Sequence, residues 1–212
     1  MSAQPPLEYG YYYHIYNRGT NGENIFRENR NYAHFLKLWG QHIEPVAGSY
    51  CFCLLRNHFH FLVRIRTEAE QETYWRDHQV GPITVAGQSF ELVEPSRAFN
   101  TLFAAYAKAI NKAYHRTGAL FERPFKRIVV DSETYFSHLV VYTHRNAQKH
   151  GFVTDFRAWP YSSYDILLSQ KKTHLLRDDV MSWFGGRTAF EAVHQVDVPD
   201  DLIAPLMLEE WR

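Results

Sequence analysis

Two histidines separated by a single residue, His58 and His60, have a spacing that suggests chemistry. In a β-strand, side chains at positions i and i+2 point to the same face, so both imidazoles could bind one divalent metal ion. Arg64 and Arg66 would follow on that face, where guanidinium groups are suited to binding phosphate. The alternative interpretation is a pair of partly exposed strand histidines that bind nothing.

A second polar pair lies in a predicted helix, where Tyr142 and Asn146 are four residues apart and therefore share one face. A tyrosine hydroxyl can act as a nucleophile, and an amide oxygen can complete a metal site. If this helix covers the sheet face that carries His58 and His60, the four side chains would meet. The structural alternative is that Tyr142 anchors the helix and Asn146 caps the backbone near its end.

The elements that must position these residues follow from the pattern of apolar residues and turn formers. Strands are predicted for residues 9–17, 49–56, 58–66 and 125–131, and helices for residues 29–44, 96–114 and 133–150. Ser96 and Ser132 are the expected N-caps of the last two helices. Residues 67–95 are polar and read as irregular, with room for a short hairpin. Short helices are expected around 161–169, 178–184 and 188–194.

The order β-α-β-β-α-β predicts an α+β fold of the ferredoxin-like type, an antiparallel sheet with two helices on one face. Alternation in the third strand predicts that Phe59, Phe61, Val63 and Ile65 pack on those helices. The opposite face would carry the histidines. An added C-terminal helix with Tyr142 is the element expected to cover it.

Length and composition indicate one domain with a hydrophobic core plus an extension, since 212 residues are few for two independent domains. No apolar run approaches the roughly 18 residues that span a bilayer, and the N-terminus lacks a signal-peptide pattern. Cys51 and Cys53 would share a strand face, a poor geometry for a mutual disulfide. We expect both in the core rather than on a metal, and we expect a cytoplasmic protein with no membrane partner.

Charge is distributed unevenly although the formal net charge is zero. Between Arg97 and Val130 there are seven basic residues and one acid, whereas residues 191–212 contain six acids and one basic residue. A basic middle and an acidic tail cancel in the sum while leaving a local positive surface, which would suit nucleic acid. Solvated helix faces are the alternative interpretation.

Five segments resemble the single-tyrosine HUH transposases, and most closely the REP-associated tyrosine transposases. Asn57 to Val63 resembles the family's His-hydrophobic-His block, and Tyr142 to Asn146 matches its Tyr-x-x-x-Asn helix. The remaining three segments, in the same order as in the family, are Tyr13 to Gly19, Gly118 to Lys126 and Trp159 to Tyr164. On this resemblance, residues 1–169 form the transposase domain and residues 170–212 a C-terminal helical extension of unknown role.

The resemblance implies a mechanism on single-stranded DNA that is flanked by a hairpin. His58, His60 and Asn146 would hold Mg²⁺ or Mn²⁺ against the scissile phosphate while Tyr142 attacks phosphorus. The products would be a 5′-phosphotyrosine link and a free 3′-hydroxyl, and reversal on another end would join strands. The expected DNA contacts are Arg18, Arg64, Arg66, Arg123, Lys126 and Arg127. The working form would be a monomer or a homodimer.

The sequence also departs from the family pattern. Arg56 stands where the family usually has Pro, and Ala147-Gln148 replace its common Pro-Val after the Asn. Neither change removes a group that the chemistry needs. Two other functions stay open: a hairpin-binding module that does not cut nucleic acid, and a metal-dependent hydrolase that activates water with Tyr142 as a structural residue.

Overall fold

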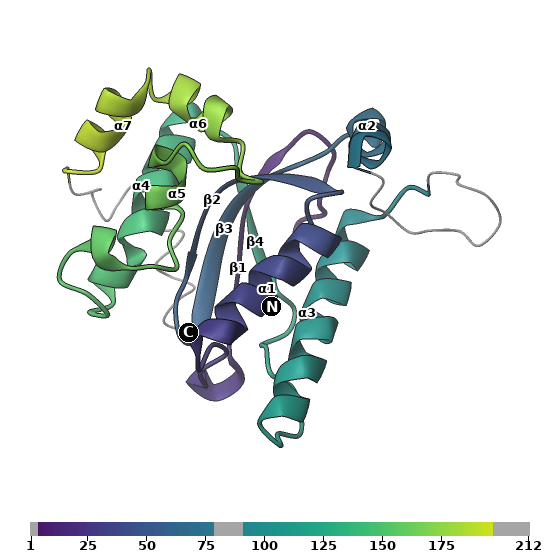
Figure 1. Cartoon of the computed structure of the whole chain (residues 1–212). Helices are drawn as coiled ribbons and strands as arrows, with labels where there is room; N and C mark the ends of the chain where they lie inside the picture. Colours follow the sequence, from purple (N-terminus) through teal and green to yellow (C-terminus); the bar gives the residue numbers. More distant parts are fainter. Residues whose placement is uncertain (1–3, 79–90, 197–212) are drawn as a thin grey trace.

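In the computed structural model, which describes residues 4–78 and 91–196, four antiparallel strands form a single sheet (Figure 1). The strands are β1 (Tyr12–Arg18), β2 (Ala47–Leu54), β3 (His58–Ile65) and β4 (Lys126–Val130). Their order across the sheet is β2-β3-β1-β4. A tight turn joins β2 to β3, where the Leu55 amide donates to the His58 carbonyl at 2.8 Å. The predicted antiparallel four-stranded sheet is confirmed.

Two long helices cover one face of this sheet, α1 (Asn29–His42) and α3 (Pro95–Ala113) (Figure 1). The four alternating apolar residues of β3, from Phe59 to Ile65, are buried in the core cluster that these helices close. Phe61 stacks on Trp39 of α1 with ring centroids 3.5 Å apart. The predicted orientation of β3 is therefore confirmed.

A second helical layer covers part of the opposite face. It consists of α4 (Glu133–Lys149), α5 (Tyr164–Leu168), α6 (Arg177–Trp183) and α7 (Arg187–Val193), with two 3-10 turns elsewhere, η1 (Thr20–Gly22) and η2 (Phe156–Ala158). Helix α4 contacts β2 and β3, and Ser132 caps it by accepting from the Tyr135 amide, as predicted. Leu62 and Cys51 lie in the core cluster beneath α4. Both cysteines are buried and free, which agrees with the core interpretation.

The stretch after β3 was predicted to be irregular, but the structure forms α2 there (Glu68–His78). Only Gln71 of α2 is buried, so the helix has no apolar stripe that periodicity could reveal. Charged side chains stabilise this helix instead. Acids lie in its first turn and Arg76 and His78 in its last, where each interacts favourably with the helix dipole. The short hairpin allowed for within residues 67–95 does not occur in residues 67–78 or 91–95, and residues 79–90 lie outside the described residues.

The N-cap of α3 is Glu94 rather than Ser96. The Glu94 carboxylate accepts hydrogen bonds from the amides of Ser96 and Arg97 at 2.9 and 2.6 Å. Pro95 takes the first helical position, where its missing N–H costs nothing. The N-cap therefore lies two residues earlier than predicted.

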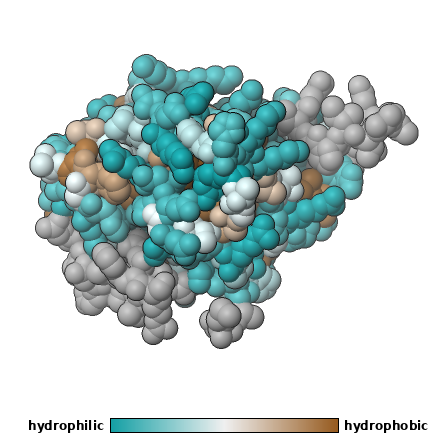
Figure 2. All heavy atoms as spheres, turned by 90° about the horizontal axis from the view of Figure 1, so that it is seen from below, coloured by the Kyte–Doolittle hydropathy of each residue, from teal (hydrophilic) through white to brown (hydrophobic). Residues whose placement is uncertain are grey.

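The face of the molecule seen from below is largely hydrophilic, with hydrophobic side chains in small separate groups (Figure 2). Among the helices described in the structure, none is long and apolar enough to cross a membrane. The large apolar side chains are concentrated on the two sides of the sheet.

Candidate active site

The start of β3 and the C-terminal half of α4 bring four predicted residues together. The His58 Nε2 and Asn146 Oδ1 atoms are 3.3 Å apart, although the two residues are separated by 88 positions in the sequence. The ring centroids of His60 and Tyr142 lie 5.8 Å apart in an edge-to-face contact. The helix thus places both of its polar side chains against the histidine face of the sheet.

These four side chains differ in exposure. His60, Tyr142 and Asn146 are 1%, 3% and 0% exposed, whereas His58 is half-buried. A buried amide normally makes hydrogen bonds with both of its polar atoms. The Asn146 side-chain nitrogen has no such partner in the described part of the chain. Its side chain faces His58, and it is the backbone carbonyl of Asn146 that receives the capping bond from the His150 amide.

The donor set at this point fits a divalent cation. Neighbouring ligands of an octahedral ion with bonds of about 2.1 Å lie about 3 Å apart. The 3.3 Å between His58 Nε2 and Asn146 Oδ1 is close to that separation. Among residues 4–78 and 91–196, no group of three or more His, Cys, Asp or Glu side chains is arranged to hold a metal. The amide oxygen of Asn146 could serve as an oxygen ligand beside the two histidines.

Four further residues, none of them among the predicted site residues, border the site. The Lys149 ammonium lies 5.2 Å from the Tyr142 ring centroid. The His150 ring lies 4.9 Å from that of His58. His14 of β1 and Asn57 of the β2–β3 turn are hydrogen-bonded to His60 and His58 respectively. A lone strand histidine such as His14 has no sequence signal of its own, because its partner is set by the pairing of β1 with β3.

The pairing of the strands also sets which basic residues share the histidine face. Arg18 lies opposite His58, and Tyr16 lies opposite both His60 and Lys126. Residues opposite one another in antiparallel strands point to the same face. Arg18 and Lys126 therefore lie on the same side of the sheet as the histidines, and Arg18 forms an ion pair with Glu122 at 3.2 Å.

The other predicted DNA contacts lie elsewhere. Arg64 shares the histidine face, but it lies about 20 Å along β3 from His58 and pairs with Glu70 of α2 at 2.8 Å. Arg66 donates to the Glu44 carbonyl at 2.9 Å. Arg127 points to the α3 side of the sheet, and Arg123 lines a pocket of about 670 Å³ between α3 and residues 118–125. The structure does not gather the six basic residues on one surface.

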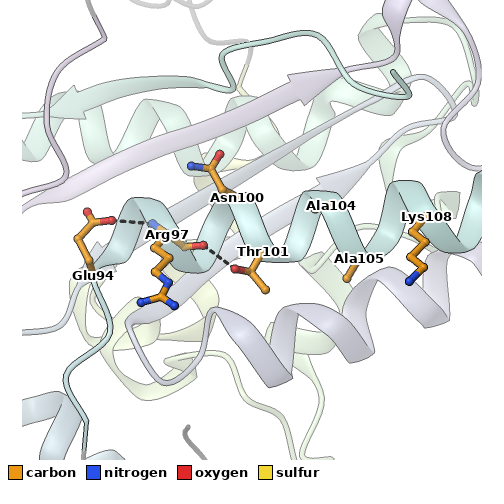
Figure 3. A pocket seen from close by; sticks show the side chains of 7 residues that line it. All are labelled: Glu94, Arg97, Asn100, Thr101, Ala104, Ala105 and Lys108. Carbon is orange, nitrogen blue, oxygen red and sulfur yellow. Dashed lines mark hydrogen bonds between the residues drawn. The ribbon is translucent and has the colours of Figure 1, made fainter. Parts of the chain in front are cut away.

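Other basic residues between Arg97 and Val130 also lie away from the histidine face. Arg97 and Lys108 lie on α3, where they line a shallow pocket of about 590 Å³ together with Asn100 and Thr101 (Figure 3). This helix covers the sheet face opposite α4, so its outer surface is remote from Tyr142. The basic middle of the sequence does not form a single positive surface beside the site.

Comparisons with known proteins give one informative likeness. No protein-family model matches the sequence, and no curated protein matches it. Among solved structures, the chain is similar to one described as the structure of the REP-associated tyrosine transposase bound to a REP hairpin, with a TM-score of 0.56 and 12% sequence identity. The alignment covers 80% of this chain and 86% of the other. The chain therefore has the fold of that solved structure.

Proposed function

We propose that the protein is a metal-dependent single-stranded DNA endonuclease and strand transferase with Tyr142 as its nucleophile. The observation that carries this proposal is the meeting of Tyr142 and Asn146 of α4 with His58 and His60 of β3. The similar solved structure is of a transposase bound to a REP hairpin. On that likeness we propose a hairpin-flanked single strand as the substrate.

The reaction exchanges one phosphate ester for another. The phenol oxygen of Tyr142 forms a bond to phosphorus while the bond between phosphorus and the 3′-oxygen breaks. The phenol gives up its proton, and the departing 3′-oxygen takes one up to become a hydroxyl. Because the new bond is again a phosphate ester, attack by another 3′-hydroxyl can reverse the step and join two strands.

Tyr142 needs help to ionise. A free tyrosine has a pKa near 10, so forming phenolate at pH 7 costs about 4 kcal/mol. The Lys149 ammonium over the Tyr142 ring would lower that cost by favouring the charged form. His58, His60 and Asn146 would hold Mg²⁺ or Mn²⁺, which when bound supplies positive charge to the phosphoryl oxygen and the leaving group. Arg18 and Lys126 share the histidine face and would contact the phosphate backbone nearby.

The test is covalent capture of single-stranded DNA. Wild-type protein incubated with hairpin-flanked DNA and Mn²⁺ should give a protein–DNA adduct that survives denaturing electrophoresis, and Tyr142→Phe should give none while retaining DNA binding. Tyr135→Phe is a matched control, because Tyr135 lies two helical turns earlier on α4 and should leave the adduct yield unchanged.

The same experiment separates the alternative functions. Cleavage that persists in Tyr142→Phe and leaves a free 5′-phosphate would show a hydrolase that activates water. Tight hairpin binding with no cleavage in any divalent cation would show a binding module. Either result would overturn the proposed function.

A further inference from the structure

His60 forms a hydrogen bond with a second buried histidine, His14 of β1. The His14 Nε2 and His60 Nδ1 atoms are 2.9 Å apart, and the two rings are within 12° of parallel. Tyr16, the cross-strand partner of His60, stacks on His14 with centroids 4.7 Å apart, and its ring centroid lies 5.9 Å from that of His60. Both histidines are buried, so this hydrogen bond is made away from solvent.

His58 is held in the same manner by its neighbour in the sequence. Its Nδ1 lies 2.8 Å from the Asn57 side-chain oxygen. An amide oxygen only accepts hydrogen bonds, so His58 Nδ1 must carry the proton. In a neutral imidazole the lone pair is then on Nε2, the atom that faces Asn146 Oδ1 across 3.3 Å.

The two contacts engage the same atom of each histidine. When the Nδ1 of a ring donates to its neighbour, Nε2 is the nitrogen that can donate its lone pair to a metal, and it points away from that neighbour. Two strand histidines at i and i+2 bind one ion only if each ring directs a nitrogen with an available lone pair at it at the same time. Without a partner at Nδ1, each ring could rotate or change tautomer.

We propose that His14 and Asn57 are positioning residues that hold His60 and His58 in the Nδ1–H tautomer, so that both present Nε2 to one divalent metal ion. This inference rests on the proposed function, since it concerns the metal site of that reaction. His14 acts on His60 from β1, and Asn57 acts on His58 from the turn before β3. Partners of this kind typically contribute 10–100-fold to metal affinity.

Variants with and without a hydrogen-bond acceptor test the inference through metal affinity. His14→Phe keeps an aromatic ring at this position but removes the hydrogen-bond acceptor of His60. Asn57→Leu keeps a side chain of similar size but removes the amide oxygen that accepts from His58. Each should weaken Mn²⁺ binding to the full-length protein by about 10–100-fold, measured from the free Mn²⁺ signal in electron paramagnetic resonance. His14→Gln and Asn57→Asp restore an acceptor oxygen and should recover most of the affinity. Tyr12→Phe, on the same strand and face as His14, is the matched control.

Folding and tautomer are measured on the same proteins. Thermal melting identifies any variant that has lost its fold. If His14→Phe or Asn57→Leu is unfolded, His14→Gln and Asn57→Asp provide the test instead. Imidazole nitrogen NMR of the metal-free wild type should show Nδ1–H for both His58 and His60, with each signal assigned by its loss in His58→Gln or His60→Gln.

An Nε2–H tautomer at either histidine would overturn the inference, as would wild-type Mn²⁺ affinity in both acceptor-free variants. A wild type that binds Mn²⁺ but forms no DNA adduct would overturn the proposed function alone, because the affinities and tautomers would still decide this inference. A wild type that binds no divalent cation would overturn both.

Discussion

Glu44, just beyond the end of α1, is a buried acid outside the candidate site. The Ser49 hydroxyl donates to its carboxylate at 2.9 Å, and the Trp39 indole donates to that hydroxyl at 3.0 Å. Burial nevertheless raises the pKa of Glu44 to about 7, because the desolvation of the carboxylate outweighs these hydrogen bonds and the charge of Arg66. Glu44 therefore makes the free energy of unfolding depend on pH.

The sign of that dependence follows from linkage. The folded pKa lies above the ordinary value of 4.5, so the folded protein holds the proton more tightly and loses stability as pH rises from about 4.5 to about 7. Glu44→Gln should remove this loss, and above pH 7 it should be more stable than wild type by as much as about 3 kcal/mol. Urea unfolding of the wild type and of Glu44→Gln at pH 5 and pH 8 measures the difference in their free energies of unfolding. A difference between them that stays constant over this range would contradict the prediction.

Helix α4 is tied to its surroundings by a buried chain of hydrogen bonds. The Phe52 amide of β2 donates to the Ser163 hydroxyl, whose oxygen lies 2.8 Å from His144 Nε2. His144 Nδ1 lies 2.8 Å from Nε2 of His194, the residue after α7. Burial lowers the pKa of both histidines, that of His194 to about 4, so both are neutral near pH 7. These bonds hold the helix that carries Tyr142 between β2 and α7.

The packing of α7 adds to this attachment, and Phe190 is its buried apolar residue. Phe190 belongs to the same core cluster as Leu62 and Tyr142. Phe190→Ala should lower the free energy of unfolding by about 3–5 kcal/mol, because it removes a fully buried aromatic ring. Urea unfolding followed by circular dichroism measures this loss. Val196→Ala is the control, since Val196 is 66% exposed and should change stability little. Wild-type stability in Phe190→Ala would show that α7 does not support the fold.

At the scale of the whole molecule, one chain contains every group of the candidate site. Helix α4 packs on β2 and β3 of its own chain, and Asn146 reaches His58 there. Under the proposed function, Tyr142 would therefore act with the histidines of its own chain. Exchange of α4 between two chains would have to break the contacts of this helix with β2 and α7.

A mixing experiment tests this arrangement. Tyr142→Phe lacks the proposed nucleophile, and His58→Ala lacks a proposed metal ligand, so each alone should form little adduct. If the site is built within one chain, an equimolar mixture should yield no more adduct than the two separate samples. Adduct at a substantial fraction of the wild-type level would show that two chains exchange the helix. Gel filtration of the mixture gives its oligomeric state in parallel.

The local pattern of the sequence predicted most of the elements. Alternation from Phe59 to Ile65 predicted the buried face of β3 because a strand has a period of two. Ser132 predicted the start of α4 because its hydroxyl satisfies a free amide there. Helix α2 was missed because it buries a single residue. Glu94 was missed because glutamate is not among the preferred N-cap residues, whereas the nearby Ser96 is.

The sequence by itself determined which residues the chemistry would need, since His58 with His60 and Tyr142 with Asn146 each form a local pattern at the spacing of a strand or a helix. Only the tertiary structure decided their surroundings. Pairing of β1 with β3 placed His14 behind His60, and packing of α4 on the sheet placed Asn146 beside His58. Strand register and helix packing bring together residues that are far apart in the chain. Local periodicity therefore cannot predict these contacts.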